Sequence, residues 1–282
     1  MEKLNIVASN RVKDNTAFMS FLRRLPKTFN HEGTEIHTAR NRLRIMDVGH
    51  LGIDGLDRVM VKRYHGLFWF QKIDYTFIRQ PKCRKAYDNT AELRRRGFDA
   101  AEELAYVEVW CHGLYQYAFF VSEVAQGERL DAHVMTLRQA GNNEDCIRQL
   151  ICEFAALVVR MHEHGVLYRD MNCGNVFCRE TGNSNNTNLW HFTLIDTNRA
   201  RFYSEDQPLS VDTAIVDLIL MNPRMGTVEL FQEEYLRQRN LYTVEEAQHI
   251  REVQRRRYER KNNWLKKFLK RYKQIYYNWL EK

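Results

Sequence analysis

Glycine and proline are scarce in this chain, and none of its apolar runs is long. Its 282 residues include 13 glycines and 4 prolines, too few for a collagen-like or a disordered chain. The longest apolar stretches, such as residues 118–121 and 215–221, the second interrupted by Asp217, are far shorter than the roughly 20 residues of a membrane-spanning helix. The first residues also lack the apolar core of a signal peptide. We therefore expect a cytoplasmic protein without a spanning helix.

Closely spaced cysteine pairs are absent as well. The six cysteines show no CxxC spacing, so we expect reduced thiols in a cytosolic compartment. A metal cluster built from His162, His164, Cys173 and Cys178 is an alternative for the segment around residue 170, where a second pattern fits the sequence better.

Positive charge is concentrated at the C-terminal end. The chain has 43 basic and 36 acidic residues, and residues 251–282 hold 12 of the former and three of the latter. The rest is close to neutral, which argues against nucleic acid as a partner. Apolar and aromatic side chains share one face of this segment: Leu265, Phe268, Leu269, Tyr272, Ile275, Tyr276, Trp279 and Leu280. We predict a basic amphipathic helix over residues 251–282 that either contacts an anionic membrane surface or packs on the preceding domain.

The order of predicted elements indicates an α+β protein. Strands and a single helix, over residues 72–96, fill the first half, and the second half is mainly helical after a short strand pair. The predicted strands cover residues 43–48, 58–64, 104–110, 115–124, 176–178 and 189–195, and a further helix covers residues 145–163.

Three polar residues in the second half form the clearest chemical pattern. Asp170 is followed five positions later by Asn175, and Asp196 comes at the end of a later strand. Phosphoryl transfer needs one carboxylate beside the acceptor hydroxyl to take its proton, and amide and carboxylate oxygens to hold Mg²⁺ against the nucleotide phosphates. This order is typical of phosphotransferases with a protein-kinase-like fold. Turn capping would explain each residue alone but not their order.

The first half supplies candidates for nucleotide contacts. Lys62 ends a β-branched strand, where its ammonium group could contact phosphates. A helical acid should hold this lysine, and Asp88 is the first choice, with Glu92 one turn further as the alternative. The strand that ends near Glu123 leads into the expected hinge between two lobes, so backbone groups of Glu123 to Ala125 are expected to recognise adenine.

With these residues in view, the chain resembles the Kdo/heptose lipopolysaccharide kinase family, especially its short members from Bacteroides-type bacteria. The resemblance covers about residues 35–205. Its matching segments are residues 39–44, 60–64, 77–89, 117–123, 170–176 and 195–202.

The resemblance implies a two-lobed kinase-like fold and a defined activity. Residues 1–122 would form a small antiparallel-sheet N-lobe with one helix, and residues 123–250 a mainly helical C-lobe with the catalytic loop. ATP and Mg²⁺ would serve to phosphorylate a sugar hydroxyl, on Kdo or heptose, of the lipopolysaccharide inner core. Asp170 would be the catalytic base, Asn175 and Asp196 the metal ligands, and Lys62 the contact to ATP phosphate.

The implied acceptor is a lipid-linked sugar. It suggests a monomeric, cytoplasmic enzyme attached to the inner leaflet of the inner membrane through its basic C-terminal helix.

Several residues depart from the usual kinase pattern. Tyr168 replaces the histidine that commonly precedes Arg-Asp, at a position we take to be structural, and Thr197-Asn198 replaces Phe-Gly. The chain also lacks an Ala-Pro-Glu segment, which argues against a regulated protein kinase. These departures keep open a pseudokinase scaffold, or a small-molecule or protein kinase of the same fold.

A positively charged stripe and a short apolar segment are two further features of the sequence. Arg79, Lys82, Arg84, Lys85 and residues 94–96 give the first-half helix a positive stripe, which would suit phosphorylated acceptor sugars or simply face solvent. Residues 68–70, Phe-Trp-Phe, form an apolar insertion that we predict to pack in the core and not to contact lipid.

Overall fold

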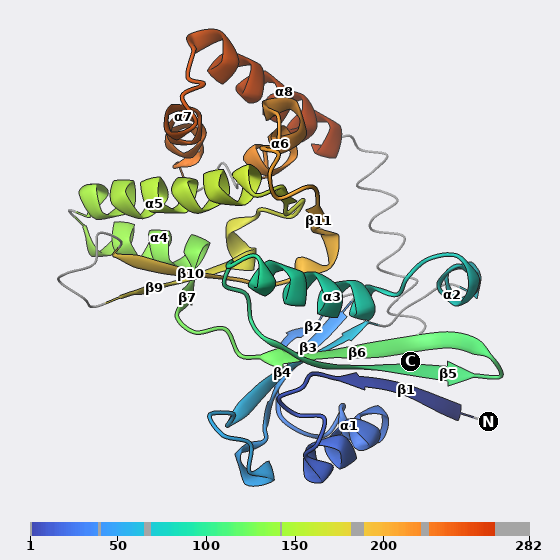
Figure 1. Cartoon of the computed structure of the whole chain (residues 1–282). Coiled ribbons are helices and arrows are strands. Elements are labelled where there is room, and N and C mark those ends of the chain that lie inside the picture. Colours follow the sequence, from blue (N-terminus) through green and yellow to red (C-terminus); the bar gives the residue numbers. More distant parts are fainter. Residues whose placement is uncertain are drawn as a thin grey trace. The chain divides into compact units, whose positions relative to one another are not determined.

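The computed structural model describes residues 2–38, 41–64, 69–141, 143–181, 189–220 and 226–262. These residues form two compact units, and Figure 1 shows the elements of each. The N-terminal unit contains the described residues up to 92 and residues 101–124, and the C-terminal unit contains residues 93–100 and the described residues from 125 to 262. The predicted division at residue 122 stays a prediction, as does the separate helix over residues 251–282, of which residues 263–282 lie outside the described part.

The N-terminal unit is built on a six-stranded antiparallel sheet in the order β1-β5-β6-β4-β3-β2. Its strands are β1 Glu2–Ala8, β2 Thr34–Thr38, β3 Asn41–Asp47, β4 Arg58–Tyr64, β5 Glu103–Cys111 and β6 Leu114–Glu123. Its helices are α1 Thr16–Thr28, α2 Trp69–Phe77 and most of α3 Lys82–Arg95, and a 3-10 turn η1 covers Gly49–Leu51.

Alternation along the strands gives this sheet two different faces. Val59 and Val61 of β4 are fully buried in a cluster that includes Phe18 and Leu22 of α1. Lys62 and Tyr64, one and three residues after Val61, therefore point to the opposite face. On that face Tyr64 packs in a cluster with Cys83 of α3, so Lys62 and α3 share one side of the sheet.

The prediction of a single helix over residues 72–96 is wrong in detail. The structure has two helices there, α2 and α3, separated at residues 78–81. Pro81 explains the break, because proline disfavours helical backbone in the preceding residue, here Gln80, and suits the start of the next helix. With α1, which the sequence interpretation also missed, the described residues of this unit contribute to three helices, where one was expected.

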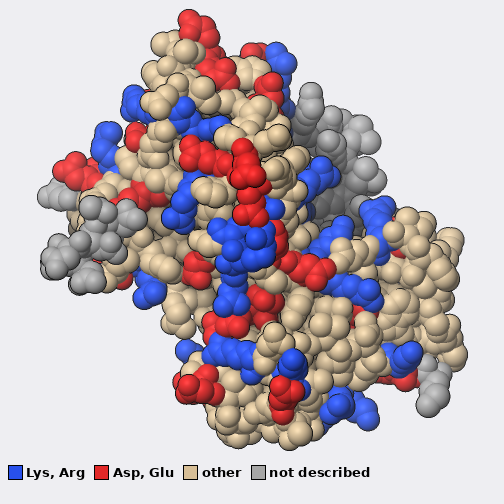
Figure 2. All heavy atoms as spheres, viewed as in Figure 1, with Lys and Arg blue, Asp and Glu red and all other residues tan. Residues whose placement is uncertain are grey.

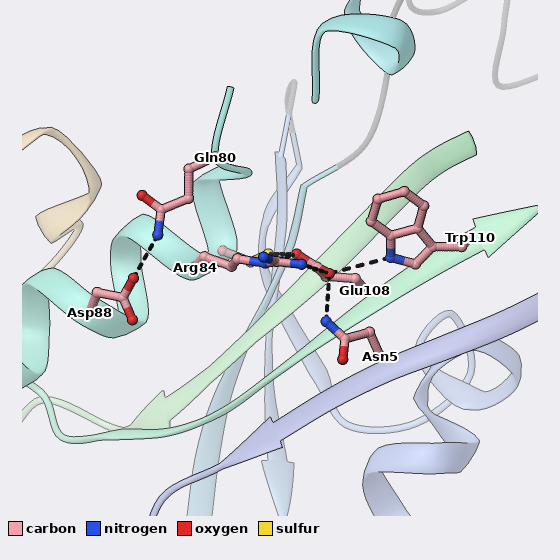
Figure 3. Close-up of polar contacts among 7 residues, drawn as sticks. Asn5, Gln80, Arg84, Asp88, Glu108 and Trp110 are labelled. Atoms are coloured by element: carbon pink, nitrogen blue, oxygen red, sulfur yellow. Dashed lines mark hydrogen bonds and ion pairs between the residues drawn. The ribbon is translucent and has the colours of Figure 1, made fainter. Parts of the chain in front are cut away.

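A buried carboxylate fastens α3 to the sheet. Glu108 of β5 is completely buried and accepts two hydrogen bonds from the Arg84 guanidinium, at 2.6 and 2.7 Å. Asn5 of β1 donates to the same carboxylate at 2.8 Å, and the Trp110 indole nitrogen lies at 3.3 Å (Figure 3). Arg84, expected to belong to an acceptor-binding or solvated stripe, is thus engaged in an internal ion pair.

Replacing Arg84 with methionine is expected to lower the free energy of unfolding by about 2–3 kcal/mol, because it leaves a buried carboxylate with fewer donors. Urea denaturation of the purified chain measures this loss. The double replacement Arg84→Met with Glu108→Met should recover most of it, since no buried charge then remains. A double variant as unstable as the single one would contradict this explanation.

The C-terminal unit is mainly helical, in agreement with the predicted order of elements. Its helices are α4 Leu130–Ala140, α5 Glu144–Glu163, α6 Val211–Leu218, α7 Val228–Gln238 and α8 Val244–Asn262. Short strands accompany them: β7 Glu128–Arg129, β8 Val166–Leu167, β9 Val176–Glu180, β10 Trp190–Leu194 and β11 Arg201–Phe202. The apolar face of α5 lies at the centre of the core, where Phe154 stacks on Phe231 of α7.

Within the described ranges, no helix combines the length and the apolar composition needed to cross a bilayer.

Candidate active site

The segment after β8 forms a tight loop that holds Asp170 and Asn175 together. The backbone amide of Asn172 donates to the backbone carbonyl of Asp170 at 2.6 Å, and the backbone amide of Asn175 donates to the backbone carbonyl of Asn172 at 2.7 Å. A 3-10 turn, η2 Cys173–Asn175, then leads into β9. The Asn175 side-chain nitrogen also donates to the Asp170 carbonyl, at 3.0 Å. This network fixes the asparagine relative to the aspartate.

The hairpin of β9 and β10 brings Asp196 to the same loop. Leu194 pairs with Val176 across the hairpin, and the Ile195 amide donates to the Asn175 carbonyl at 3.0 Å. Asp196 follows directly, with a left-handed backbone at φ 59°. Such a conformation is uncommon for a residue other than glycine and often marks a functional site. Asp170, Asn175 and Asp196 thus gather in one part of the C-terminal unit.

The donor set in this loop suits a hard divalent cation. The side-chain nitrogen of Asn175 donates to the Asp170 carbonyl, a bond that does not use the side-chain oxygen. Asp196 accepts a short hydrogen bond from the side-chain nitrogen of Asn198, and a carboxylate with two oxygens can accept this bond and still ligate a metal. Amide and carboxylate oxygens, completed by phosphate oxygens and water, are the usual Mg²⁺ ligands at nucleotide sites. The residues therefore fit the expected metal.

Tyr168 links the two halves of this site. Its hydroxyl donates a short hydrogen bond to the carbonyl of Ile195, the residue before Asp196. The ring is completely buried, and burial raises the pKa of the phenol well above its ordinary value, so the hydroxyl stays a donor. Tyrosine in place of histidine therefore has a structural role here, as expected.

Asp217 is a buried anchor for the loop that the sequence interpretation missed. Its carboxylate, on α6, accepts hydrogen bonds from the backbone amides of Tyr168 at 2.8 Å and Arg169 at 2.6 Å. It is completely buried, and Arg169 has a left-handed backbone at φ 63°. The signal was a single carboxylate inside an apolar run, a pattern that requires a specific partner when the run is buried.

His162 extends this anchor toward α7. Its Nε2 lies 3.2 Å from the Asp217 carboxylate, and its Nδ1 lies 2.8 Å from the Tyr235 hydroxyl. Both rings are fully buried. His162 therefore serves the packing of α5 against α6 and α7. The alternative of a metal cluster at His162, His164, Cys173 and Cys178 gains no support, since the described residues hold no metal-competent group of three or more His, Cys, Asp or Glu.

Three of the six cysteines, Cys83, Cys173 and Cys178, are buried, and the other three are partly buried. All six, which are among the described residues, are free. Burial raises the pKa of Cys173, in the catalytic loop, to about 12. It raises the pKa of Cys178 to about 12 as well. Neither thiol is therefore activated as a nucleophile.

Arg199 is a second residue that sequence reasoning missed. Its guanidinium lies 3.4 Å from the Asp170 carboxylate, and more than half of its side chain is exposed. An arginine beside the expected base can orient the carboxylate or meet an anionic group of the acceptor. The family-specific segment 195–202 contained this arginine, but no spacing rule assigned it a contact.

The candidate residues for contacts to ATP phosphate, Lys62 with Asp88 or Glu92, belong to the N-terminal unit. Lys62 is partly buried, and its Nζ lies 5.2 Å from the centre of the Tyr64 ring. Asp88 is exposed and accepts a hydrogen bond of 2.6 Å from Gln80, whereas Glu92 is partly buried (Figure 3 shows Asp88 and Gln80). The position of Lys62 relative to either acid, and to Asp170, stays a prediction.

The expected hinge strand is partly committed to the sheet. The Glu123 amide donates to the Glu102 carbonyl at 2.9 Å, and the Glu123 carbonyl accepts from the Ser122 hydroxyl at 3.0 Å. Its side chain lies 2.5 Å from Arg11. Recognition of adenine by the backbone amide of Glu123 would therefore require its hydrogen bond to Glu102 to open, which shifts the expectation toward the next residues up to Ala125.

An antiparallel sheet unit, a helical unit and a loop with this order of aspartate and asparagine define a kinase-like phosphotransferase. The chain belongs to the lipopolysaccharide kinase (Kdo/WaaP) family, whose model matches residues 54–208, more than half of its length. The protein is therefore a kinase of lipopolysaccharide biosynthesis, and the resemblance to this family is confirmed. Its likeness to the short Bacteroides-type members stays a prediction.

A solved structure supports the same fold. The chain is similar to WaaP in complex with acyl carrier protein, with a TM-score of 0.57 and 17% identity, over 92% of this chain and 100% of that one. At this identity the likeness bears on the fold alone, and it confirms the α+β kinase-like class. No curated protein sequence matches the chain.

Proposed function

We propose that this kinase transfers the γ-phosphoryl group of ATP, with Mg²⁺, to a sugar hydroxyl of the lipopolysaccharide inner core, on either Kdo or heptose. One observation carries the proposal. Asp170, Asn175 and Asp196 are tied into a single hydrogen-bonded loop system, within a chain whose family acts on lipopolysaccharide.

Each residue of the loop has a chemical task in this proposal. Asp170 orients the acceptor hydroxyl and takes its proton as the oxygen attacks. Asn175 and Asp196 hold the metal through their side-chain oxygens. Mg²⁺, when bound with ATP, supplies positive charge at the phosphate oxygens. Arg199 lies next to Asp170, where it can keep the carboxylate oriented before the acceptor arrives.

The N-terminal unit would supply the contacts to ATP. Lys62 would contact the phosphates, and residues 123–125 would contact adenine, with Ala125 more suited than the amide of Glu123. Asp88 or Glu92 would hold Lys62. The partial burial of Glu92, against the exposed Asp88 with its bond to Gln80, favours Glu92 in this proposal.

Glu92→Gln is therefore expected to raise the KM for ATP and lower kcat about 10-fold or more, because Lys62 loses the charge that positions it. Asp88→Asn should change either constant less than about threefold. Steady-state kinetics with the two matched amide variants measure both effects. The reverse order would restore Asp88 as the acid partner.

The function is tested by mass spectrometry of an inner-core acceptor. The purified chain is incubated with ATP, Mg²⁺ and lipopolysaccharide core that lacks phosphate, with separate acceptors that end in Kdo and in heptose. The proposal predicts the gain of one phosphoryl group on one of these acceptors. Phosphorylation of neither, with Mg-ATP bound, would point to another acceptor class or to a pseudokinase scaffold.

The proposed acceptor implies work at the inner leaflet of the inner membrane, as a cytoplasmic monomer on the membrane surface. The predicted anchor over residues 251–282 falls mostly outside the described residues.

A further inference from the structure

Helix α2 presents an apolar face to solvent. Trp69, Ile73 and Phe77 follow one another at intervals of four, which places them on the same side of the helix. They are 73%, 40% and 74% exposed, and the neighbouring Phe70 and Ile78 are 53% and 78% exposed. The prediction that this segment packs in the core is therefore wrong for Trp69 and Phe70, while Phe68 lies outside the described residues.

The opposite side of α2 is fastened to the sheet. The Lys72 ammonium donates to the Gln116 side chain of β6 at 2.7 Å, and the Tyr115 amide donates to the Thr76 hydroxyl at 3.0 Å. The Tyr75 ring packs against the Tyr115 ring, with centroids 5.6 Å apart. Polar and aromatic contacts thus hold one side of the helix inward, and the apolar side chains face outward because of that attachment.

Positive charge flanks this apolar surface. Residues 69–85 contain five basic side chains and one acidic one, and two of the basic ones, Lys72 and Arg84, contact Gln116 and the buried Glu108 of the sheet. The acid, Asp74, is paired with Arg79 at 3.0 Å. In Figure 2 the right-hand surface, where α2 lies in Figure 1, is mostly tan, with blue side chains beside it. Exposed tryptophan and phenylalanine beside lysine and arginine match the interface of an anionic bilayer.

We propose that α2 docks the protein on an anionic lipid surface, with Trp69, Phe70, Ile73, Phe77 and Ile78 inserted at headgroup depth. The inference deepens the proposed function, since a lipid-linked acceptor lies in such a surface. A second copy of the chain fits less well, because a two-fold contact through α2 would bring two positively charged flanks together.

The test is sedimentation of the full chain with vesicles, without ATP or acceptor. Vesicles of phosphatidylethanolamine with phosphatidylglycerol are compared with vesicles of phosphatidylcholine. Wild type should bind the anionic vesicles more tightly and lose affinity as salt rises. Trp69→Gln with Phe77→Gln should weaken binding about tenfold or more, because the variant lacks two aromatic side chains that would move from water into the lipid surface.

Two further variants keep the test decisive. Leu241→Ser with Val244→Ser removes exposed apolar side chains, 41% and 57% exposed, from the other unit and should bind as wild type does. Trp69→Leu keeps an apolar side chain and should bind within about threefold of wild type. Equal binding by the double glutamine variant and wild type would overturn the proposal. So would a glutamine variant whose only change is the loss of self-association in analytical ultracentrifugation.

The outcome is separable from that of the proposed function. Vesicle binding needs no turnover, so it can be observed even if no inner-core sugar is phosphorylated. If the kinase proposal holds and α2 docks on lipid, the glutamine variant should phosphorylate a soluble, deacylated acceptor at the wild-type rate and a vesicle-borne acceptor about tenfold more slowly.

Discussion

Asp170→Asn is expected to reduce kcat for phosphoryl transfer by about 10²–10⁴-fold, the usual contribution of a general base. Asparagine has the same shape, and the Asp170 carbonyl that accepts from Asn175 and Asn172 is unchanged. The loop should therefore keep its backbone structure and lose the proton acceptor together with the ion pair between Asp170 and Arg199. Single-turnover phosphorylation of the core acceptor measures the loss.

The same variant should still bind nucleotide. Stabilisation by Mg-ATP in a thermal shift assay should remain close to that of wild type. Asp206→Asn, an exposed residue in the same unit, is the matched control and should leave kcat unchanged. An Asp170→Asn enzyme that turns over at the wild-type rate would remove Asp170 from the role of base.

Asp217→Leu is expected to lower the free energy of unfolding by about 3–5 kcal/mol, the usual cost of removing one partner of a buried charged contact. The backbone amides of Tyr168 and Arg169 would lose a fully buried acceptor. Since these amides belong to the residues just before Asp170, kcat should fall together with stability. Urea denaturation and the kinase assay give the two readouts.

Asp212→Leu is the control for this second prediction. It lies on the same helix, in the exposed first turn, and should cost no more than about 1 kcal/mol, the usual value for a charge at a helix start. Equal losses for Asp212 and Asp217 would show that α6 is sensitive to leucine in general, and the anchoring role of Asp217 would then be wrong.

The order of Asp170, Asn175 and Asp196 could be recognised in the sequence because these residues lie close to one another along the chain. Asp170 and Asn175 share one loop, and Asp196 follows a hairpin whose strands were both predicted. The helix α5 was also predicted to within a residue at its start, because its apolar positions recur with helical spacing over five turns.

What the sequence did not yield were contacts between distant segments. Arg84 and Glu108 belong to different elements, and neither carries a local sign of its partner. Asp217 reaches a loop almost fifty positions earlier. Charged residues read one at a time look like solvated surface, and only the fold shows that Glu108 and Asp217 are buried.

Other features were missed although the sequence contained a signal for them. Pro81 marked the boundary between α2 and α3. In residues 1–40, Asn15 caps a helix whose buried side chains are Phe18, Phe21, Leu22 and Leu25, a regular helical spacing. Trp69 and Phe70 were assigned to the core because large aromatic side chains are usually buried. Their exposure is the feature of α2 that composition cannot show.

Metal-dependent nucleotide binding tests the central claim most directly. We propose that a Mg²⁺-dependent ATP site is formed by Asp170, Asn175 and Asp196. ATP with Mg²⁺ at about 100 times its Kd should therefore stabilise wild type by about 2.7 kcal/mol. ATP with a chelator should stabilise it far less, and Asp196→Asn should lose the difference between the two conditions. Equal stabilisation of wild type with and without Mg²⁺, or an Asp196→Asn variant that responds to Mg²⁺ as wild type does, would contradict the account.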